Sequence, residues 1–165
     1  YRDTLIRILL LLIPLTLLYM TGVGSVAQMV EETELECLSL NIYHEARNES
    51  TAGMVAVGQV TLNRVDSSRF PDSVCGVVRQ GVYRNGFPVR NRCQFSWHCD
   101  GISDVPYNIR AYNRSVEIAQ WLLFTNPWLP DLTDGSLWYH ASYVLPKWSR
   151  VKKKTMTIDT HIFYR

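Results

Sequence analysis

Apolar residues that recur at steps of three and four predict a helix that begins near Ile109 and continues to Leu123. The pair Asn126-Pro127 should end it, because the residue before a proline avoids helical geometry. Two earlier helices are expected over 32–47 and 52–65. The apolar positions of the predicted stripe are Ile109, Tyr112, Val116, Ala119 and Leu123.

Short signals mark the ends of these earlier elements. Acidic residues between Glu31 and Glu36 suit the positive N-terminal end of the first helix. Ser50 or Thr51 can cap the second helix, which is apolar on most sides and is therefore expected to be buried. A turn at 70–72 precedes a short predicted helix over 73–80.

The remaining segments carry a different pattern. Residues 81–106 are rich in Gly, Pro, Asn and Arg without a sustained period, and we predict an ordered loop closed by one disulfide. Aromatic and β-branched runs at 137–143 and 155–164, separated by 146–154, predict a small antiparallel β element. The expected fold class is therefore α+β, mainly helical with a small C-terminal sheet.

The first thirty residues have the order of an export segment rather than of a folded element. Arg2 and Arg7 precede an apolar run from Ile8 to Met20, which is followed by small residues up to Ala27. This order fits a cleaved signal peptide or an uncleaved anchor that would tie the chain to the membrane. Both interpretations place 1–30 as a targeting segment and export 31–165 as one catalytic domain, periplasmic or held at the outer side of the membrane.

Composition narrows the class of protein. A chain of 165 residues, 47% of them hydrophobic, supports one domain with a core, and we expect a monomer. A net charge of +2 argues against a nucleic-acid partner, which would require a concentrated basic face. The basic run from Lys152 to Lys154 is interpreted as a solvated loop or as a contact with anionic wall polymer or lipid head groups.

Four cysteines follow the export segment, as expected for disulfides in an oxidising compartment. Because Cys93 and Cys99 enclose only five residues, we pair them with each other and Cys37 with Cys75. A structural zinc site is the alternative, but these cysteines lack its tight paired spacing.

Glu45 is the strongest candidate for chemistry. It lies three residues after Ile42 and seven after Leu38, so on a continuous helix it shares their apolar face. Desolvation there would raise the pKa of the carboxyl group and keep a proton available for donation. The structural alternative is an ion pair between Glu45 and Arg47, Arg64 or another cation.

Seven short blocks follow one another in the order 43–49, 59–65, 70–71, 74–78, 93–97, 138–141 and 161–165. Together they resemble the cell wall hydrolase family of spore cortex-lytic enzymes. The resemblance implies a lysozyme-like α+β fold, cleavage of peptidoglycan glycan strands, and Glu45 as the catalytic acid, with no cofactor. The chain departs from the family pattern at Asn48 and Asp159, where glycine is common, and at Trp138, where histidine is common.

The resemblance also implies a lytic transglycosylase, in which one carboxyl group acts first as acid and then as base. A hydrolytic muramidase would require a second carboxylate, for which Glu49, Asp100 and Asp104 are candidates. Glu49 is alternatively a local hydrogen-bond partner or cap; one helical turn from Glu45, its charge would raise that pKa. A non-catalytic wall-binding protein is a further alternative.

A metal-dependent amidase is the remaining alternative. His44, His140 and His161 could be imagined around a metal ion with Glu45, but their spacing does not match His-Glu-x-x-His. We therefore expect no metal.

Aromatic and hydrogen-bonding residues are candidates for sugar binding, because aromatic faces stack on sugars and amides bind their hydroxyls. The segment Gln94-Phe95-Ser96-Trp97 inside the disulfide loop has this character, although its aromatic residues are equally suited to the core. The candidate substrate-binding set is Tyr43, Glu49, Gln94, Phe95, Ser96, Trp97, Tyr139, His140, Tyr143 and His161.

Overall fold

Helices dominate the first part of the computed structural model, which describes residues 33–125 and 129–165. The expected export segment and the Asn126-Pro127 stop lie outside the described residues. Within the described ranges, no helix is both long enough and apolar enough to cross a bilayer. The helices are 33–46, α2 (Thr51–Val65), α3 (Val74–Val78) and α4 (Ile109–Gln120), which continues as a π-helical turn over Trp121–Thr125.

Side-chain caps fix where three of these helices begin. The hydroxyl oxygens of Ser50 and Ser73 accept the backbone N–H groups of Gly53 and Gly76 at the starts of α2 and α3. Asn108 caps α4 in the same way. Each cap satisfies a backbone donor that the first helical turn leaves without a partner. Ser50 is thus the cap that the sequence predicted for the second helix.

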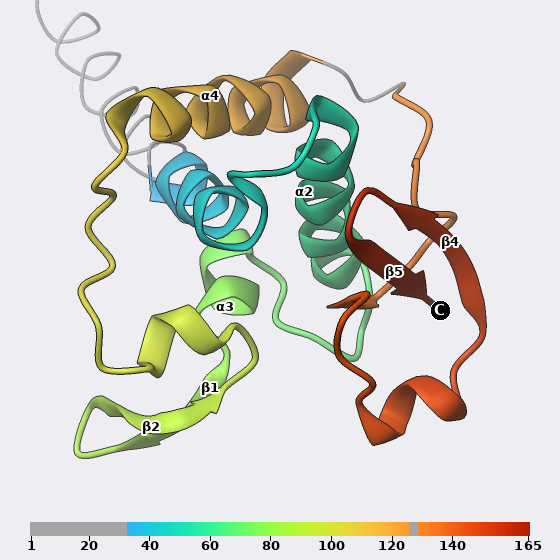
Figure 1. Ribbon diagram of the computed structural model, residues 1–165. Coiled ribbons are helices and arrows are strands. Elements are labelled where there is room, and N and C mark those ends of the chain that lie inside the picture. Colours follow the sequence, from blue (N-terminus) through green and yellow to red (C-terminus); the bar gives the residue numbers. More distant parts are fainter. Residues whose placement is uncertain (1–32, 126–128) are drawn as a thin grey trace, which may run out of the picture. The chain divides into compact units, whose positions relative to one another are not determined.

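The core lies where the helix of residues 33–46, α2 and α4 meet (Figure 1). Leu38 and Ile42 pack there with Met54 and Val57 of α2, which is buried on most sides as expected. The helices approach closely at Gly58, where an added Cβ would come within 2.4 Å of Leu122 Cδ1. A side chain at this position would displace the end of Leu122.

The buried face of α4 differs from the predicted stripe. Ile109 is 63% exposed, whereas Ser115, Ile118 and Ala119 are buried. The serine is tolerated in the interior because its hydroxyl donates to the carbonyl oxygen of Ala111, 3.1 Å away. The stripe predicted from apolar residues alone therefore started at an exposed position, Ile109, and omitted the buried polar residue Ser115.

The segment predicted as a loop over 81–106 contains a β-hairpin, so that prediction was wrong. Strands β1 (Gly81–Arg84) and β2 (Phe87–Cys93) pair antiparallel and lead to a 3-10 turn over Ser96–Cys99. Asn85 and Gly86 connect the strands with φ values of 52° and 82°. Asn-Gly is a strong hairpin signal, but both faces of this ribbon are largely exposed, so no apolar alternation accompanied it.

A three-stranded antiparallel sheet forms the C-terminal β element, in the order β3-β5-β4. The strands are β3 (Trp138–Ala141), β4 (Lys154–Ile158) and β5 (His161–Tyr164). Phe163 of β5 packs against α2 and joins the sheet to the helices. The expected α+β class is confirmed.

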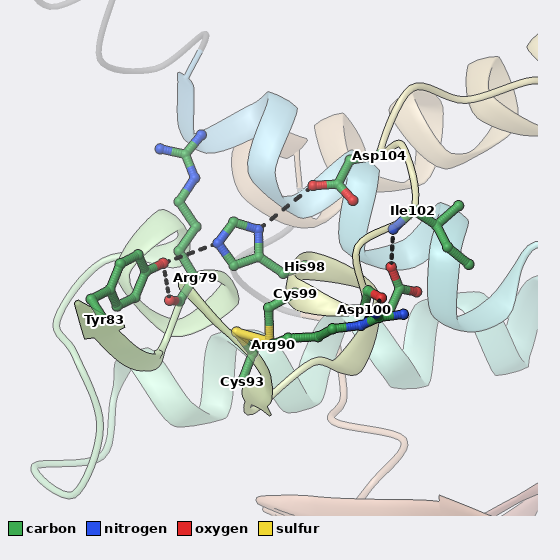
Figure 2. Close-up of a disulfide and its surroundings, with 9 residues drawn as sticks. All are labelled: Arg79, Tyr83, Arg90, Cys93, His98, Cys99, Asp100, Ile102 and Asp104. Carbon is green, nitrogen blue, oxygen red and sulfur yellow. Dashed lines mark hydrogen bonds and ion pairs between the residues drawn. A yellow bond between two sulfur atoms is a disulfide. The ribbon is translucent and has the colours of Figure 1, made fainter. Parts of the chain in front are cut away.

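Two disulfides join distant or irregular segments in the pairing that the sequence favoured. Cys37–Cys75 fastens the helix of residues 33–46 to α3, and Cys93–Cys99 ties the end of β2 to the end of the 3-10 turn. Figure 2 shows the second bridge beneath the loop that carries Asp100 and Asp104.

Candidate active site

Glu45 stands on the last turn of the helix of residues 33–46, half-buried. Its Oε2 accepts a hydrogen bond from the hydroxyl of Tyr139, 3.1 Å away. Desolvation raises the pKa of the carboxyl group, and this outweighs the Tyr139 bond and the positive charge of Arg64, which lower it. Among the described residues, no Lys or Arg nitrogen lies within 4.0 Å of the carboxylate. The geometry therefore favours a protonated acid over the ion-pair alternative.

Arg64 of α2 lies near enough to Glu45 for its positive charge to act on that carboxyl group. Its Nε donates to the carbonyl oxygen of Leu137 at 2.8 Å, and its guanidinium lies 5.3 Å from the ring centre of Phe70 and 5.1 Å from that of Phe95. Burial lowers the pKa of Arg64, while the nearby Glu45 and Tyr139 raise it. The sequence suggested Arg64 only as an ion-pair partner; its aromatic packing required the fold.

Tyr139 remains a hydrogen-bond donor near neutral pH. Burial first, and then the charge of Glu45, raise the pKa of its hydroxyl well above 10. Its ring meets the ring of His161 edge-on at 5.2 Å. Because Tyr139 and His161 come from neighbouring strands, the sheet itself fixes the direction of the hydroxyl toward Glu45.

A cleft of roughly 310 Å³ opens over Glu45. A second hollow of roughly 280 Å³ adjoins it, and the two share His44 and Arg47. The sequence offered no pattern that would place Thr160 or Ala141 in the cleft, since a turn and a strand end bring them there. The first cleft is lined by His44, Glu45, Arg47, Asn48, Glu49, Ala141, Tyr143, Thr160 and His161.

Glu49 lines the cleft, and its side chain is hydrogen-bonded to the turn between β4 and β5. The helix ends at residue 46, so Glu49 is not one turn beyond Glu45 on a continuous helix. Its carboxylate accepts the backbone N–H and the hydroxyl of Thr160, and lies 3.9 Å from Nδ1 of His161. Burial lowers the pKa of His161, although Glu49 opposes this effect. Glu49 is thus a local hydrogen-bond partner, and Ser50 is the cap.

The aromatic segment after β2 divides between core and surface. Phe95 and Trp97 are both buried in the core, Phe95 beside Arg64 and Trp97 stacked on the ring of His44 at 4.4 Å, where it also borders the second hollow. Gln94 is exposed and lines a separate hollow beside the hairpin, and Ser96 is exposed.

The other candidate residues are also separated by the fold. Tyr43 is fully buried, and its hydroxyl accepts the backbone N–H of Asn108 beneath the cleft. His140 points to the opposite face of the sheet from Tyr139, where its Nε2 lies 2.9 Å from the hydroxyl of Tyr164. Tyr143, by contrast, is 84% exposed at the cleft.

The three histidines considered for a metal lie in different environments. His44 contacts the carbonyl oxygen of Asp104, His161 faces Glu49, and His140 lies on the far face of the sheet. Across residues 33–125 and 129–165, no three His, Cys, Asp or Glu side chains form a group that could hold a metal ion.

Two of the three departures from the family pattern have a structural account. Asp159 adopts a left-handed φ of 47°, and its carboxylate accepts both the N–H and the hydroxyl of Ser50. Asn48 does not adopt a left-handed φ. Trp138 lies under the ammonium group of Lys152, 3.0 Å from its ring centre, and beside Arg69. The aspartate therefore supplies contacts that glycine cannot.

Comparison with known proteins agrees with this geometry. The sequence model described as Cell Wall Hydrolase matches residues 48–164, beginning just after Glu45. The spore cortex-lytic enzymes of Oceanobacillus iheyensis and Bacillus subtilis are 41% and 44% identical over 54 and 45 residues, which are 33% and 27% of this chain. These segments span only 20% and 15% of the two relatives.

Solved structures extend the likeness to the fold. The catalytic domain of the Bacillus cereus SleB protein matches with a TM-score of 0.56 and 27% identity, over 81% of this chain and 91% of that one. The catalytic domain of the germination-specific lytic transglycosylase SleB from Bacillus anthracis gives the same score and identity, over 80% and 93%.

Proposed function

Because the chain belongs to the cell wall hydrolase family, we propose that it cleaves peptidoglycan glycan strands as a lytic transglycosylase, with Glu45 as its acid and base. The observation that carries this proposal is the half-buried Glu45 carboxyl group at the cleft, its pKa raised by desolvation. A raised pKa favours the protonated form of the carboxyl group, which is the form that can give its proton to a leaving oxygen.

The proposed reaction uses one carboxyl group twice. Glu45 donates its proton to the glycosidic oxygen between muramic acid and glucosamine as the C1–O bond breaks. The resulting carboxylate then takes the proton of the muramoyl C6 hydroxyl, whose oxygen bonds to C1 and closes a 1,6-anhydro ring. Throughout, Oε2 can keep accepting the hydrogen bond from Tyr139, which leaves Oε1 free to exchange the proton in this proposal.

The surroundings of Glu49 favour this route over hydrolysis. An inverting or retaining hydrolase needs a second carboxylate to activate water or to attack C1. Glu49 is the other carboxylate in the cleft lining, and two donors of Thr160 engage it. A mechanism in which Glu45 is both acid and base does not require Glu49 to act, so the hydrogen bonds between Glu49 and Thr160 can remain in place.

Product analysis tests the proposal. The full chain is incubated with purified peptidoglycan, and the soluble products are analysed by mass spectrometry. We expect 1,6-anhydromuramoyl ends; reducing muramic acid ends would identify a hydrolase instead. Glu45→Gln should lower the rate by about 10²-fold or more, the usual contribution of a general acid, while binding to the wall persists. An unchanged rate would remove Glu45 from the mechanism.

We also propose that the enzyme acts outside the cytoplasmic membrane. Peptidoglycan lies there, and two disulfides suit an oxidising compartment. The proposed partner is thus the glycan strand, with the membrane as a second partner where the apolar run of residues 8–20 is retained.

A further inference from the structure

The second hollow has no role in the bond cleavage proposed above. It adjoins the Glu45 cleft through His44 and Arg47. Charged, aromatic and aliphatic side chains line it together. Its lining is His44, Arg47, Trp97, Asp100, Ile102, Ser103, Asp104, Val105 and Tyr107.

Arg47 presents an oriented cation between the two hollows. Its guanidinium lies 5.1 Å and 5.4 Å from the ring centres of Tyr43 and Tyr107, and its Nη2 donates to the hydroxyl of Tyr107 at 3.1 Å. Its Nη1 is 3.5 Å from the carbonyl oxygens of Tyr43 and His44. No carboxylate of the described residues lies within 4.0 Å. A planar guanidinium fixed in this way is suited to bind a carboxylate through two hydrogen bonds.

The loop after the Cys93–Cys99 disulfide supplies the opposite charge (Figure 2). Asp100 Oδ1 accepts the backbone N–H of Ile102 at 2.7 Å, and Asp104 Oδ2 lies 3.7 Å from Nδ1 of His98. In the same lining, the side chains of Ile102 and Val105 are about three-quarters exposed. The hollow therefore offers one cation, two anions and apolar contacts, which match a short peptide carrying carboxylate and ammonium groups.

We propose that this hollow binds the peptide attached to muramic acid, with a peptide carboxylate at Arg47 and an ammonium group near Asp100 and Asp104. This inference rests on the proposed function. The peptide branches from the C3 lactyl group of the same sugar whose C1 reacts, so a substrate engaged by Glu45 carries its peptide a few bonds away. The hollow that shares His44 and Arg47 with the Glu45 cleft is within that reach.

A pair of substrates tests the proposal. One is peptidoglycan strands with their peptides, and the other is the same strands after an amidase has removed the peptides. With the full chain, kcat/KM should be at least about tenfold higher for the peptide-bearing strands, which corresponds to about 1.4 kcal/mol. The difference should appear mainly in KM, because the peptide contacts are present before and during bond cleavage.

Variants assign the preference to the hollow. In Arg47→Gln the ratio of the two kcat/KM values should fall toward one, and Arg47→Lys, which keeps the charge but loses the planar fork, should give an intermediate ratio. Arg84→Gln is the matched control, because this exposed arginine at the end of β1 lines neither hollow. It should leave the ratio unchanged.

The outcomes separate this inference from the proposed function. If the wild-type chain cleaves neither substrate, the proposed function fails. If it cleaves both equally, the function stands and the peptide site is wrong. Full preference retained in a folded Arg47→Gln would also overturn the site, and full preference retained in Arg47→Lys would do so if Arg47→Gln does not fold.

Discussion

At the scale of single residues, burial and two side chains from other elements shift the pKa of the Glu45 carboxyl group. Glu45 comes from a helix end, Tyr139 from β3 and Arg64 from α2. Burial raises the pKa of Glu45, and the other two groups limit that rise. Burial therefore favours the protonated acid, and in the proposed reaction the hydroxyl of Tyr139 stabilises the carboxylate that forms after proton transfer.

Tyr139→Phe should move the pH dependence of the reaction. The phenol O–H favours the Glu45 carboxylate, so its loss raises the pKa of the carboxyl group further. Activity that requires the protonated acid falls as pH rises through that pKa. The alkaline limb of kcat/KM against pH should therefore shift to higher pH, with a rate loss of roughly tenfold or more at the optimum.

Tyr83→Phe is the control for this measurement. The Tyr83 hydroxyl bonds to Nε2 of His98 and to the carbonyl oxygen of Arg79, outside the Glu45 cleft. Its pH profile should coincide with that of the wild type. An alkaline limb that moves to lower pH in Tyr139→Phe would show that the hydroxyl does not act on Glu45 in this way.

Glu45→Gln should be inactive and yet more stable at neutral pH. Folding raises the pKa of Glu45. At pH values between the pKa of the unfolded chain and that of the folded chain, the folded chain therefore binds more protons than the unfolded chain. Wild-type stability therefore falls as pH rises through this window, whereas glutamine has no such dependence. The gain in Tm should be a few degrees at pH 7, on the order of 1 kcal/mol, and absent near pH 4. Thermal unfolding across pH would contradict this if the gain were larger in acid.

At the scale of elements, the β4–β5 turn is joined to the start of α2. The carboxylate of Asp159 accepts the N–H of Ser50 at 2.9 Å and its hydroxyl at 2.6 Å, while Ser50 caps α2. An added Cβ at Gly53 would lie 2.4 Å from Asp159 Oδ2, so a side chain there would displace the carboxylate that bonds to Ser50. The same turn carries Thr160, which engages Glu49.

Two substitutions at Asp159 separate its hydrogen bonds from its backbone conformation. Asp159→Ala loses both bonds and keeps a left-handed φ, so it should destabilise the fold by about 2 kcal/mol. Asp159→Gly loses the same bonds but adopts this φ freely, and should be about 1 kcal/mol less costly. Urea unfolding measures both. An alanine variant as stable as the glycine variant would show that the backbone strain is negligible.

At the scale of the whole molecule, two disulfides constrain very different lengths of chain. Cys37–Cys75 closes a sequence separation of 38, and Cys93–Cys99 closes one of only 6. The longer bridge links the helix that carries Glu45 to α3. The shorter one holds the turn on which Trp97 stacks against His44.

Removing the longer bridge should cost more stability than removing the shorter one. Loop-closure entropy predicts about 4 kcal/mol for the Cys37→Ala, Cys75→Ala pair and about 2 kcal/mol for Cys93→Ala, Cys99→Ala. Denaturant unfolding of the two double variants under the same conditions provides the comparison. The reverse order would mean that native contacts around the hairpin, rather than chain entropy, dominate.

Local patterns in the sequence were sufficient for several features of this protein. Helical spacing placed Glu45 on an apolar face, Ser50 was recognisable as a cap, and the short interval between Cys93 and Cys99 gave the disulfide pairing. Ordered motifs indicated the cell wall hydrolase family. Each of these depends on residues close in sequence or on residue type alone, so no knowledge of the fold was needed.

Tertiary structure decided what lies around Glu45. Residues of β3, the β4–β5 turn and α2 that lie near Glu45 are more than a dozen positions away from it in the sequence. No periodicity of the sequence predicts which face of a strand points toward the end of a helix. Because successive side chains of a strand point to opposite faces, Tyr139 points toward Glu45 and the adjacent His140 points away from it. The sequence singled out Glu45 as the candidate acid. Packing determined which neighbours shift the pKa of its carboxyl group, because desolvation and hydrogen bonding arise only when those elements meet.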